Sequence, residues 1–458
     1  MTVKLRQVVG GVVAPKGFKA AGVFCDIKRL GTGKGSDKGQ KRDLALLLSE
    51  TPATVAGMFT TNQVCAAPVK VCLQRVKRGR AQAIVINSGN ANACTGRQGL
   101  NDAIKMVRFT EKALALSQGT ALVGSTGRIG INLPMDNVQA GIIEAATELG
   151  STVDHGNRAA EAIMTSDTRS KQVAVEFDVR GLPVRIGGMC KGAGMIQPGM
   201  SATGARPPAT PLHATMLCFL TSDAAVEAKI LHAALNEAVA KSFNRITVDG
   251  DMSTNDTVLL LANGLSQPPK VQSPKSKLQN SIPEPIIKSR KSQEFQIFQA
   301  ALEFVCLELA KMIVRDGEGV SRFVTVRVSG ARSFGEADAA ARAIANSALV
   351  KTSWHGGDPN WGRIIDALGY SSARVIEEKV DIGYSAPGTK RVLWSLKRGQ
   401  PTKATFKELC TAVASPEFDL HINLNLGKSG ALIYAADLTE AYVEFNKGDV
   451  SDPGSLGG

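Results

Sequence analysis

One passage near the middle of the chain constrains its fold and chemistry more than any other. Residues 189–198 read Met-Cys-Lys-Gly-Ala-Gly-Met-Ile-Gln-Pro, and after a spacer rich in Pro and Gly the chain continues as His-Ala-Thr-Met-Leu at 213–217. Glycines let the backbone bend where other residues would clash. A small residue followed by Thr, reached through such a loop, is how a self-cleaving precursor would present a new N-terminal threonine. Thr215 is therefore a candidate nucleophile, and Ala214–Thr215 a candidate cleavage site.

A threonine freed in this way carries its own base. The α-amine has a pKa of about 7.7–8.0 and can take the proton of the hydroxyl near physiological pH. Gly-rich loops with a lysine are common, however, and so are Ala-Thr pairs. From these residues alone, an ordinary structural loop remains the alternative.

Composition and cysteine usage exclude several classes of protein. The chain has 458 residues, ordinary apolar and charged fractions, and no apolar run near the roughly 20 residues that span a bilayer. The start lacks the apolar core of a secretory signal, so we expect a cytoplasmic protein with no membrane contact. The eight cysteines form no Cys-x-x-Cys pair and the five histidines are not spaced as ligands, so we expect neither disulfides nor a metal.

The net charge of +13 raises the alternative of a nucleic-acid-binding protein. Much of the excess lies at 265–292, a Pro-rich stretch with six basic residues and one Glu. No aromatic residues alternate with these charges to stack on bases. We therefore interpret 265–292 as a solvated surface loop and expect no nucleic acid as a partner.

Two passages from a strand into a loop carry polar groups suited to a reaction site. The apolar run 81–86 predicts a buried strand that leads into an amide-rich loop at 87–96 and a helix over about 99–116. The second passage is 121–130, where Thr126 and Gly127 could direct a hydroxyl and a backbone N–H at a developing oxyanion.

Helical periodicity predicts further helices over 225–241, 294–314 and 335–349. Between the first two lies a polar segment, 242–257, with three Asp residues. Their spacing is not that of a calcium loop, and we expect them to brace loops around the nucleophile. Leu-Gly-Lys-Ser-Gly at 426–430 lacks the full phosphate-binding pattern, which argues against nucleotide binding.

The motifs together resemble the ornithine acetyltransferase family, the glutamate N-acetyltransferases of arginine biosynthesis. The resemblance rests on Lys-Gly-Ala-Gly-Met-Ile-x-Pro, on Ala-Thr-Met-Leu followed by Thr-Ser-Asp-Ala, and on the segments at 87–96, 121–130, 242–257, 351–363 and 437–446. It extends from about residue 10 to residue 446, with the motifs in family order.

The resemblance assigns roles to individual residues. It implies Thr215 as the nucleophile and Thr126 with Gly127 as the oxyanion hole. The substrate contacts that it implies, besides Thr215, are Thr165, Lys191, Glu318, Asn446 and Ser451. For Thr165 a capping turn is the competing explanation, and for Glu318 an exposed turn residue. Ser451 stands in a tail that departs from the family pattern.

The resemblance also implies a fold and an activity. The expected fold is a layered α/β fold with two β-sheets between helices (α-β-β-α) and a smaller C-terminal part. Self-cleavage would give chains 1–214 and 215–458, which would associate further into a heterotetramer. The enzyme would move acetyl from N-acetylornithine to glutamate through an acyl-enzyme without a cofactor, and acetyl-CoA stays open as a second donor. The alternative is an amidohydrolase or aminopeptidase that uses the same threonine with water as acceptor.

Two insertions depart from the family pattern. One is the basic segment 265–292. The other, 199–212, separates the two halves of the cleavage motif and creates rival nucleophiles at Thr203 and Thr210. We favour Thr215 because the residues after it complete the motif.

Overall fold

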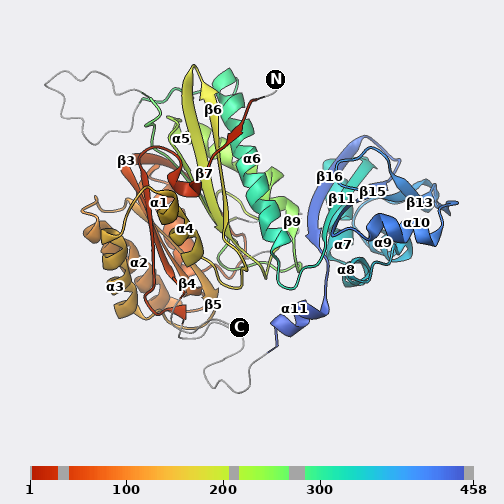
Figure 1. Cartoon of the computed structure of the whole chain (residues 1–458), viewed down its shortest axis with the longest axis horizontal. Coiled ribbons are helices and arrows are strands. Elements are labelled where there is room, and N and C mark those ends of the chain that lie inside the picture. Colours follow the sequence, from red (N-terminus) through yellow and green to blue (C-terminus); the bar gives the residue numbers. More distant parts are fainter. Residues whose placement is uncertain (1–2, 29–40, 206–215, 268–283, 448–458) are drawn as a thin grey trace.

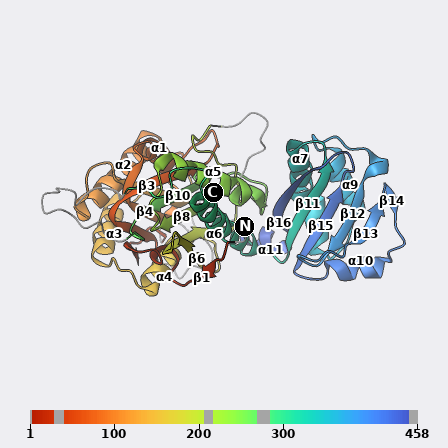
Figure 2. The same cartoon turned by 90° about the horizontal axis from the view of Figure 1, so that it is seen from above.

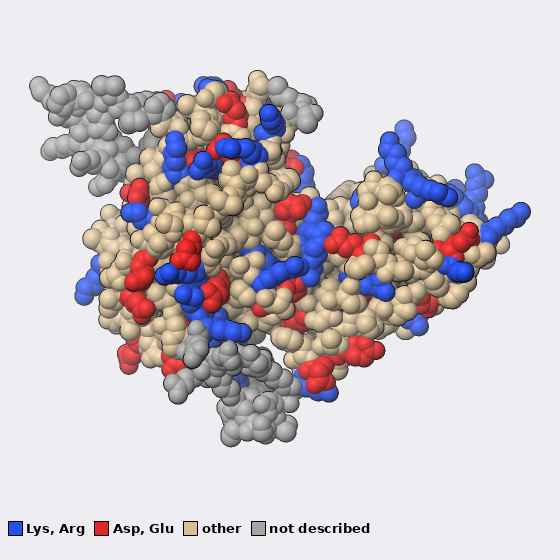
Figure 3. Space-filling view, in the orientation of Figure 1, with Lys and Arg blue, Asp and Glu red and all other residues tan. Residues whose placement is uncertain are grey.

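The computed structural model describes residues 3–28, 41–205, 216–267 and 284–447 of the chain. These residues form two lobes, each built around one β-sheet (Figure 1). None of the helices within these ranges is both long enough and apolar enough to span a membrane. On the face drawn in Figure 3, basic and acidic side chains are interspersed over both lobes.

The larger lobe contains a nine-stranded sheet in the order β1-β6-β7-β8-β10-β3-β4-β5, with β2 also paired to β3. Its strands are β1 (Arg6–Gln7), β2 (Phe18–Val23), β3 (Leu44–Phe59), β4 (Arg80–Asn90), β5 (Ala121–Arg128), β6 (Lys171–Val179), β7 (Leu182–Lys191), β8 (Leu217–Ser222) and β10 (Thr257–Ala262). Its helices are α1 (Ala67–Val76), α2 (Gly96–Ala113), α3 (Met135–Thr147), α4 (Val153–Ala162), α5 (Ala228–Lys241) and α6 (Gln293–Arg315).

Helices cover both faces of this sheet because its central strands are apolar on both sides. In β8, Leu217 and Phe219 join the core cluster that contains residues of α1–α4. The alternate residues Cys218 and Leu220 join the cluster that contains residues of α5 and α6. Successive side chains of a strand point to opposite faces, so a strand buried on both faces is apolar throughout.

The smaller lobe contains a seven-stranded sheet in the order β14-β13-β12-β15-β11-β16-β9. Its strands are β9 (Ile246–Thr247), β11 (Phe323–Ala331), β12 (Asp381–Ser385), β13 (Leu393–Lys397), β14 (Gln400–Pro401), β15 (Glu417–Asn423) and β16 (Ser429–Ala436). Its helices are α7 (Phe334–Asn346), α8 (Ala348–His355), α9 (Trp361–Gly369), α10 (Phe406–Val413) and α11 (Glu440–Phe445). Short 3₁₀ turns occupy Gly11–Val13, Phe243–Arg245 and Glu377–Lys379.

The two lobes share apolar contacts beside α6. Strand β9 comes from the segment between α5 and β10, yet it pairs with β16 of the smaller lobe. Phe323 of β11 and Tyr434 of β16 stack with ring centroids 5.7 Å apart. Both belong to the same core cluster as the α6 residues. Figure 2 shows β16 on the side of the smaller sheet that faces α6.

The mixed α/β class with two sheets is confirmed, and most predicted elements lie within a few residues of their expected bounds. The helix expected over 335–349 is in fact two helices, α7 and α8, separated at Ser347. The hydroxyl of Ser347 accepts the backbone N–H of Val350 at 3.4 Å and so caps α8.

Candidate functional site

The candidate site is built around Lys191, the last residue of β7. The Lys191 side chain is only 3% exposed. Its Nζ donates to Oγ1 of Thr165 at 2.7 Å and to Oγ1 of Thr126 at 3.3 Å. Three residues predicted from separate motifs therefore meet at one buried ammonium group.

Thr126 and Gly127 lie at the end of β5, against the end of β4. Thr126 is buried, and Gly127 has a φ of +131° that strongly favours glycine. A Cβ on Gly127 would stand 2.3 Å from the carbonyl carbon of Gly89, so only glycine lets the two strands approach this closely. This close pairing of β5 with β4 fixes the position of Thr126, whose hydroxyl accepts from Lys191.

The polar segment before β10 braces this region, as the sequence predicted. The Asn255 side-chain amide donates to the carbonyls of Ala91 and Ser125, at 2.7 and 2.8 Å. Oδ1 of Asp256 accepts the backbone N–H of Met216 at 2.6 Å. Asp256 therefore holds Met216, which follows Thr215 in the chain and directly precedes β8.

Glu318 and Asn446 lie beside the loop of residues 191–194, which we call the lysine loop. Asn446 Nδ2 donates to a carboxylate oxygen of Glu318 at 3.1 Å, and the Glu318 N–H donates to the carbonyl of Ala193 at 2.9 Å. A Cβ on Gly194 would stand 2.5 Å from the Glu318 carboxylate. Gly194 thus leaves room for an acidic group beside the lysine loop. In Figure 1 the C-terminal end of α6, which leads to Glu318, and α11, which leads to Asn446, lie on the same lower side of the molecule.

Burial and neighbouring charges shift the pKa values of the ionisable groups of the site. Burial lowers the pKa of Lys191, and the nearby carboxylates of Asp167, Glu318 and Asp256 oppose that effect. Burial also raises the pKa of Asp256 well above its usual range, opposed by the Met216 N–H and by Lys191. Strongly perturbed groups gathered in one place are typical of functional sites.

Three predicted site residues, Ala214, Thr215 and Ser451, lie outside the described residues, as does the rival Thr210. The rival Thr203 is described. It is exposed, and its hydroxyl accepts the backbone N–H of Ala205 at 3.2 Å in a local turn.

Asp167, which was not among the residues predicted from the sequence, contacts the backbone next to Lys191 directly. Asp167 is buried, its Oδ1 accepts the N–H of Gly192 at 2.7 Å, and its Oδ2 lies 3.9 Å from Lys191 Nζ. The feature of the sequence that could have indicated Asp167 as a site residue is its place two residues after Thr165. That Thr-Ser-Asp run also fits a capping turn, because Asp167 does accept the Thr165 N–H, at 3.0 Å.

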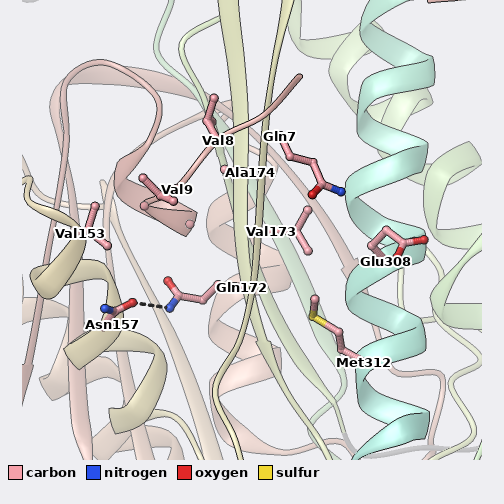
Figure 4. Close-up of a pocket in the computed structure, with 12 residues that line it drawn as sticks. Gln7, Val8, Val9, Val153, Asn157, Gln172, Val173, Ala174, Glu308 and Met312 are labelled. Atoms are coloured by element: carbon pink, nitrogen blue, oxygen red, sulfur yellow. Dashed lines mark hydrogen bonds between the residues drawn. The ribbon is translucent and has the colours of Figure 1, made fainter. Parts of the chain in front are cut away.

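A separate cavity of about 310 Å³ lies away from these residues, between the N-terminal segment, α4, β6 and α6 (Figure 4). Its polar lining consists mainly of amide groups such as Gln172, which donates to Asn157 at 2.9 Å. Its lining includes none of the predicted site residues. Within the described residues, no three His, Cys, Asp or Glu side chains are grouped as a metal site would require.

Comparison with known proteins gives one consistent family. The model of the ArgJ family matches residues 19–448. The arginine biosynthesis bifunctional protein ArgJ of Symbiobacterium thermophilum is 43% identical over 442 residues, which cover 96% of this chain and 99% of that protein. The glutamate N-acetyltransferase of Methanocaldococcus jannaschii is 40% identical and covers 96% of this chain and 99% of its own length. A solved ornithine acetyltransferase chain from Mycobacterium tuberculosis, complexed with ornithine, is 39% identical, with a TM-score of 0.39 over 43% of this chain and 100% of that chain.

Proposed function

Because the chain belongs to the ArgJ family, we propose that it is a glutamate N-acetyltransferase that moves the acetyl group of N-acetylornithine to glutamate. The names of its relatives favour acetyl transfer over the hydrolase alternative. The observation that carries the proposal is the meeting of Thr126, Thr165 and the Lys191 ammonium beside the start of β8.

Self-cleavage comes first in this mechanism. Oγ of Thr215 attacks the carbonyl of Ala214, the acyl group moves from nitrogen to oxygen, and water hydrolyses the resulting ester. The products are chains 1–214 and 215–458, the second with a free α-amine on Thr215. Thr215 is preferred to Thr203 because Asp256 anchors the next residue, Met216, directly before β8, whereas Thr203 is exposed in a turn.

Acetyl transfer then proceeds in two steps. Thr215 Oγ attacks the acetyl carbon of N-acetylornithine while the α-amine takes the hydroxyl proton. The C–N bond breaks, the departing nitrogen takes that proton, and ornithine leaves an acetyl ester on Thr215. The amine of glutamate attacks that ester in the second step and regenerates the threonine.

The surrounding residues stabilise and orient this chemistry. Thr126 and the N–H of Gly127 bind the oxyanion, where donors set in advance lower the barrier most. Lys191 keeps a positive charge beside the reacting atoms, and Thr165 contacts the substrate. Glu318 pairs with the ammonium of ornithine, supported by Asn446, and Ser451 is a further substrate contact.

The cleaved chains remain together and pair further into a heterotetramer in this proposal. Strand β7 precedes the cleavage point and pairs with β8 after it over six residue pairs, which supports a stable association. Acetyl-CoA remains a candidate second donor, consistent with relatives that are named bifunctional. The cytoplasmic location stays a prediction.

The proposal is tested with Thr215→Ala, and Thr203→Ala serves as the matched control. Thr215→Ala is expected to remain one uncut chain with no formation of N-acetylglutamate from N-acetylornithine, whereas Thr203→Ala should be cut and active. Processed, active protein from Thr215→Ala would contradict the assignment. Release of acetate at a rate independent of added glutamate would instead support the hydrolase.

A further inference from the structure

A buried charge cluster of Lys171, Asp167 and Asp316 adjoins Lys191 through Asp167. Lys171 opens β6 and its side chain is 1% exposed. Its Nζ donates to Oδ1 of Asp167 at 2.6 Å and to Oδ2 of Asp316 at 2.5 Å, and those side chains are 0% and 3% exposed. Burying a charge has a large free-energy cost unless the charge is well paired. Three buried charged groups in one place are therefore not expected to serve packing alone.

The cluster joins the segments that carry the predicted substrate contacts. Asp167 accepts the N–H of Thr165 through Oδ2 and the N–H of Gly192, next to Lys191, through Oδ1. Asp316 accepts the N–H and the hydroxyl of Thr168 and stands two residues before Glu318. Lys171 therefore links the loop after α4, the end of β7 and the turn after α6 at one point.

We propose that Lys171 is a positioning residue for acetyl transfer, which holds Asp167 and Asp316 together and thereby sets both the place and the charge state of Lys191. This inference rests on the proposed function. Within the described residues, the Lys171 ammonium donates to Asp167, to Asp316 and to the carbonyl of Arg169, and not to Thr126, Thr165 or Lys191. It acts through Asp167, whose carboxylate contacts the Lys191 loop.

The charges around Lys191 predict the direction in which its pKa changes when one of them is removed. Among the described residues, the charged groups that act most strongly on Lys191 come from four segments and are Asp167, Lys171, Glu318 and Asp256. Of these, only Lys171 is a cation, and its repulsion lowers the pKa of Lys191 while the carboxylates raise it. Removing the Lys171 charge should raise the pKa of Lys191. Asp316 acts through Lys171, with which it pairs: removing the Asp316 charge leaves the positive charge of Lys171 less neutralised and should lower the pKa of Lys191.

The pH profile of kcat/KM for acetyl transfer reports this effect. Since kcat/KM reflects groups of the free enzyme, loss of the Lys191 proton should define its basic limb. Lys171→Met is expected to move that limb to higher pH, as removal of a nearby like charge does. Lys171→Arg should leave it near the wild-type position, and Asp316→Asn should move it to lower pH.

Shifts of the basic limb in opposite directions in Lys171→Met and Asp316→Asn distinguish this role from a purely structural one. Damage to the fold would lower kcat/KM at every pH without moving the limb, and it would not give shifts of opposite sign. Lys241→Met removes an exposed lysine that pairs with Glu237 of α5 and Glu303 of α6, none of which forms an ion pair with Lys171 or Lys191 in the described part of the chain, and should leave the profile unchanged. If Lys171→Met does not fold, Asp316→Asn decides the question alone: a shift to lower pH supports the inference, and an unmoved limb or a shift to higher pH overturns it.

Two results would overturn the inference. One is an unmoved basic limb in both Lys171→Met and Asp316→Asn, and the other is a shift of the same sign in both. Absence of acetyl transfer in the wild-type enzyme would instead refute the proposed function, so the two failures are distinguishable.

Discussion

At the scale of single residues, the site depends on small side chains that let charged ones approach. Gly194 is the clearest case, because a Cβ there would stand 2.5 Å from the Glu318 carboxylate. Its backbone φ lies outside the left-handed region, so alanine would bring no backbone strain. The effect of a substitution at Gly194 should therefore fall on Glu318 alone.

Gly194→Ala is expected to raise KM for N-acetylornithine with little change in kcat. Displacing Glu318 weakens its pairing with the ornithine ammonium, and losing a hydrogen bond to a charged group costs about 1.5–3 kcal/mol, or roughly tenfold or more in KM. Gly369→Ala in α9 is the control, because no atom lies within 4 Å of its Cβ position. A Gly194→Ala enzyme with unchanged KM would argue against Glu318 as a substrate contact.

The sequence predicted these residues where a short motif carried them, as it did for Lys191, Thr126 and Glu318. It did not predict Asp167 or Asp316, because neither differs locally from an ordinary turn or helix end. Their role appears only when the loop after α4 and the end of α6 meet around Lys171. Contacts between residues 145 positions apart leave no local pattern in the sequence.

At the scale of elements, periodicity predicted the long amphipathic helices but not where neighbouring helices divide. The structure ends α7 at Asn346, and Ser347 caps α8, within a run whose sequence is Ala-rich and predicts one continuous helix. Strand β9 was not predicted either, since two residues carry no periodic signal. Its pairing with β16 is decided by the packing of the two lobes.

Helix α8 buries an ionisable group whose titration should be visible in stability. Lys351 is 3% exposed and donates to the carbonyl of Ala436. Burial lowers its pKa from 10.5 to about 8, opposed by Asp249 and Asp437. The unfolded chain holds this proton up to about pH 10.5. Between pH 8 and 10.5 the unfolded state therefore binds more protons, and the contribution of Lys351 to stability rises with pH.

Lys351→Met should remove this increase in stability between pH 8 and 10.5. The wild-type free energy of unfolding, measured in urea, is expected to gain up to about 3 kcal/mol relative to Lys351→Met between pH 8 and 10.5. Lys407→Met, at an exposed position of α10, is the matched control and should follow the wild type. Parallel curves for wild type and Lys351→Met would show that Lys351 keeps its proton on folding.

At the scale of the whole molecule, the proposed cleavage would divide the sequence without dividing the larger lobe. Strand β8 lies between β7 and β10, and β10 pairs in turn with β3. Strands from residues before and after Thr215 thus form one continuous sheet. The sequence could predict the cleavage motif and the α/β class, whereas this interleaving of strands from distant segments required the structure.

The intact mass of the purified protein under denaturing conditions tests the central claim most directly, before and after incubation with N-acetylornithine. We predict two chains from a sample that behaves as one particle in native buffer, one comprising residues 1–214 and the other beginning at Thr215. The substrate should add the mass of one acetyl group to the second chain only. A single unbroken chain that still forms N-acetylglutamate, or a cut before Thr203, would contradict the account.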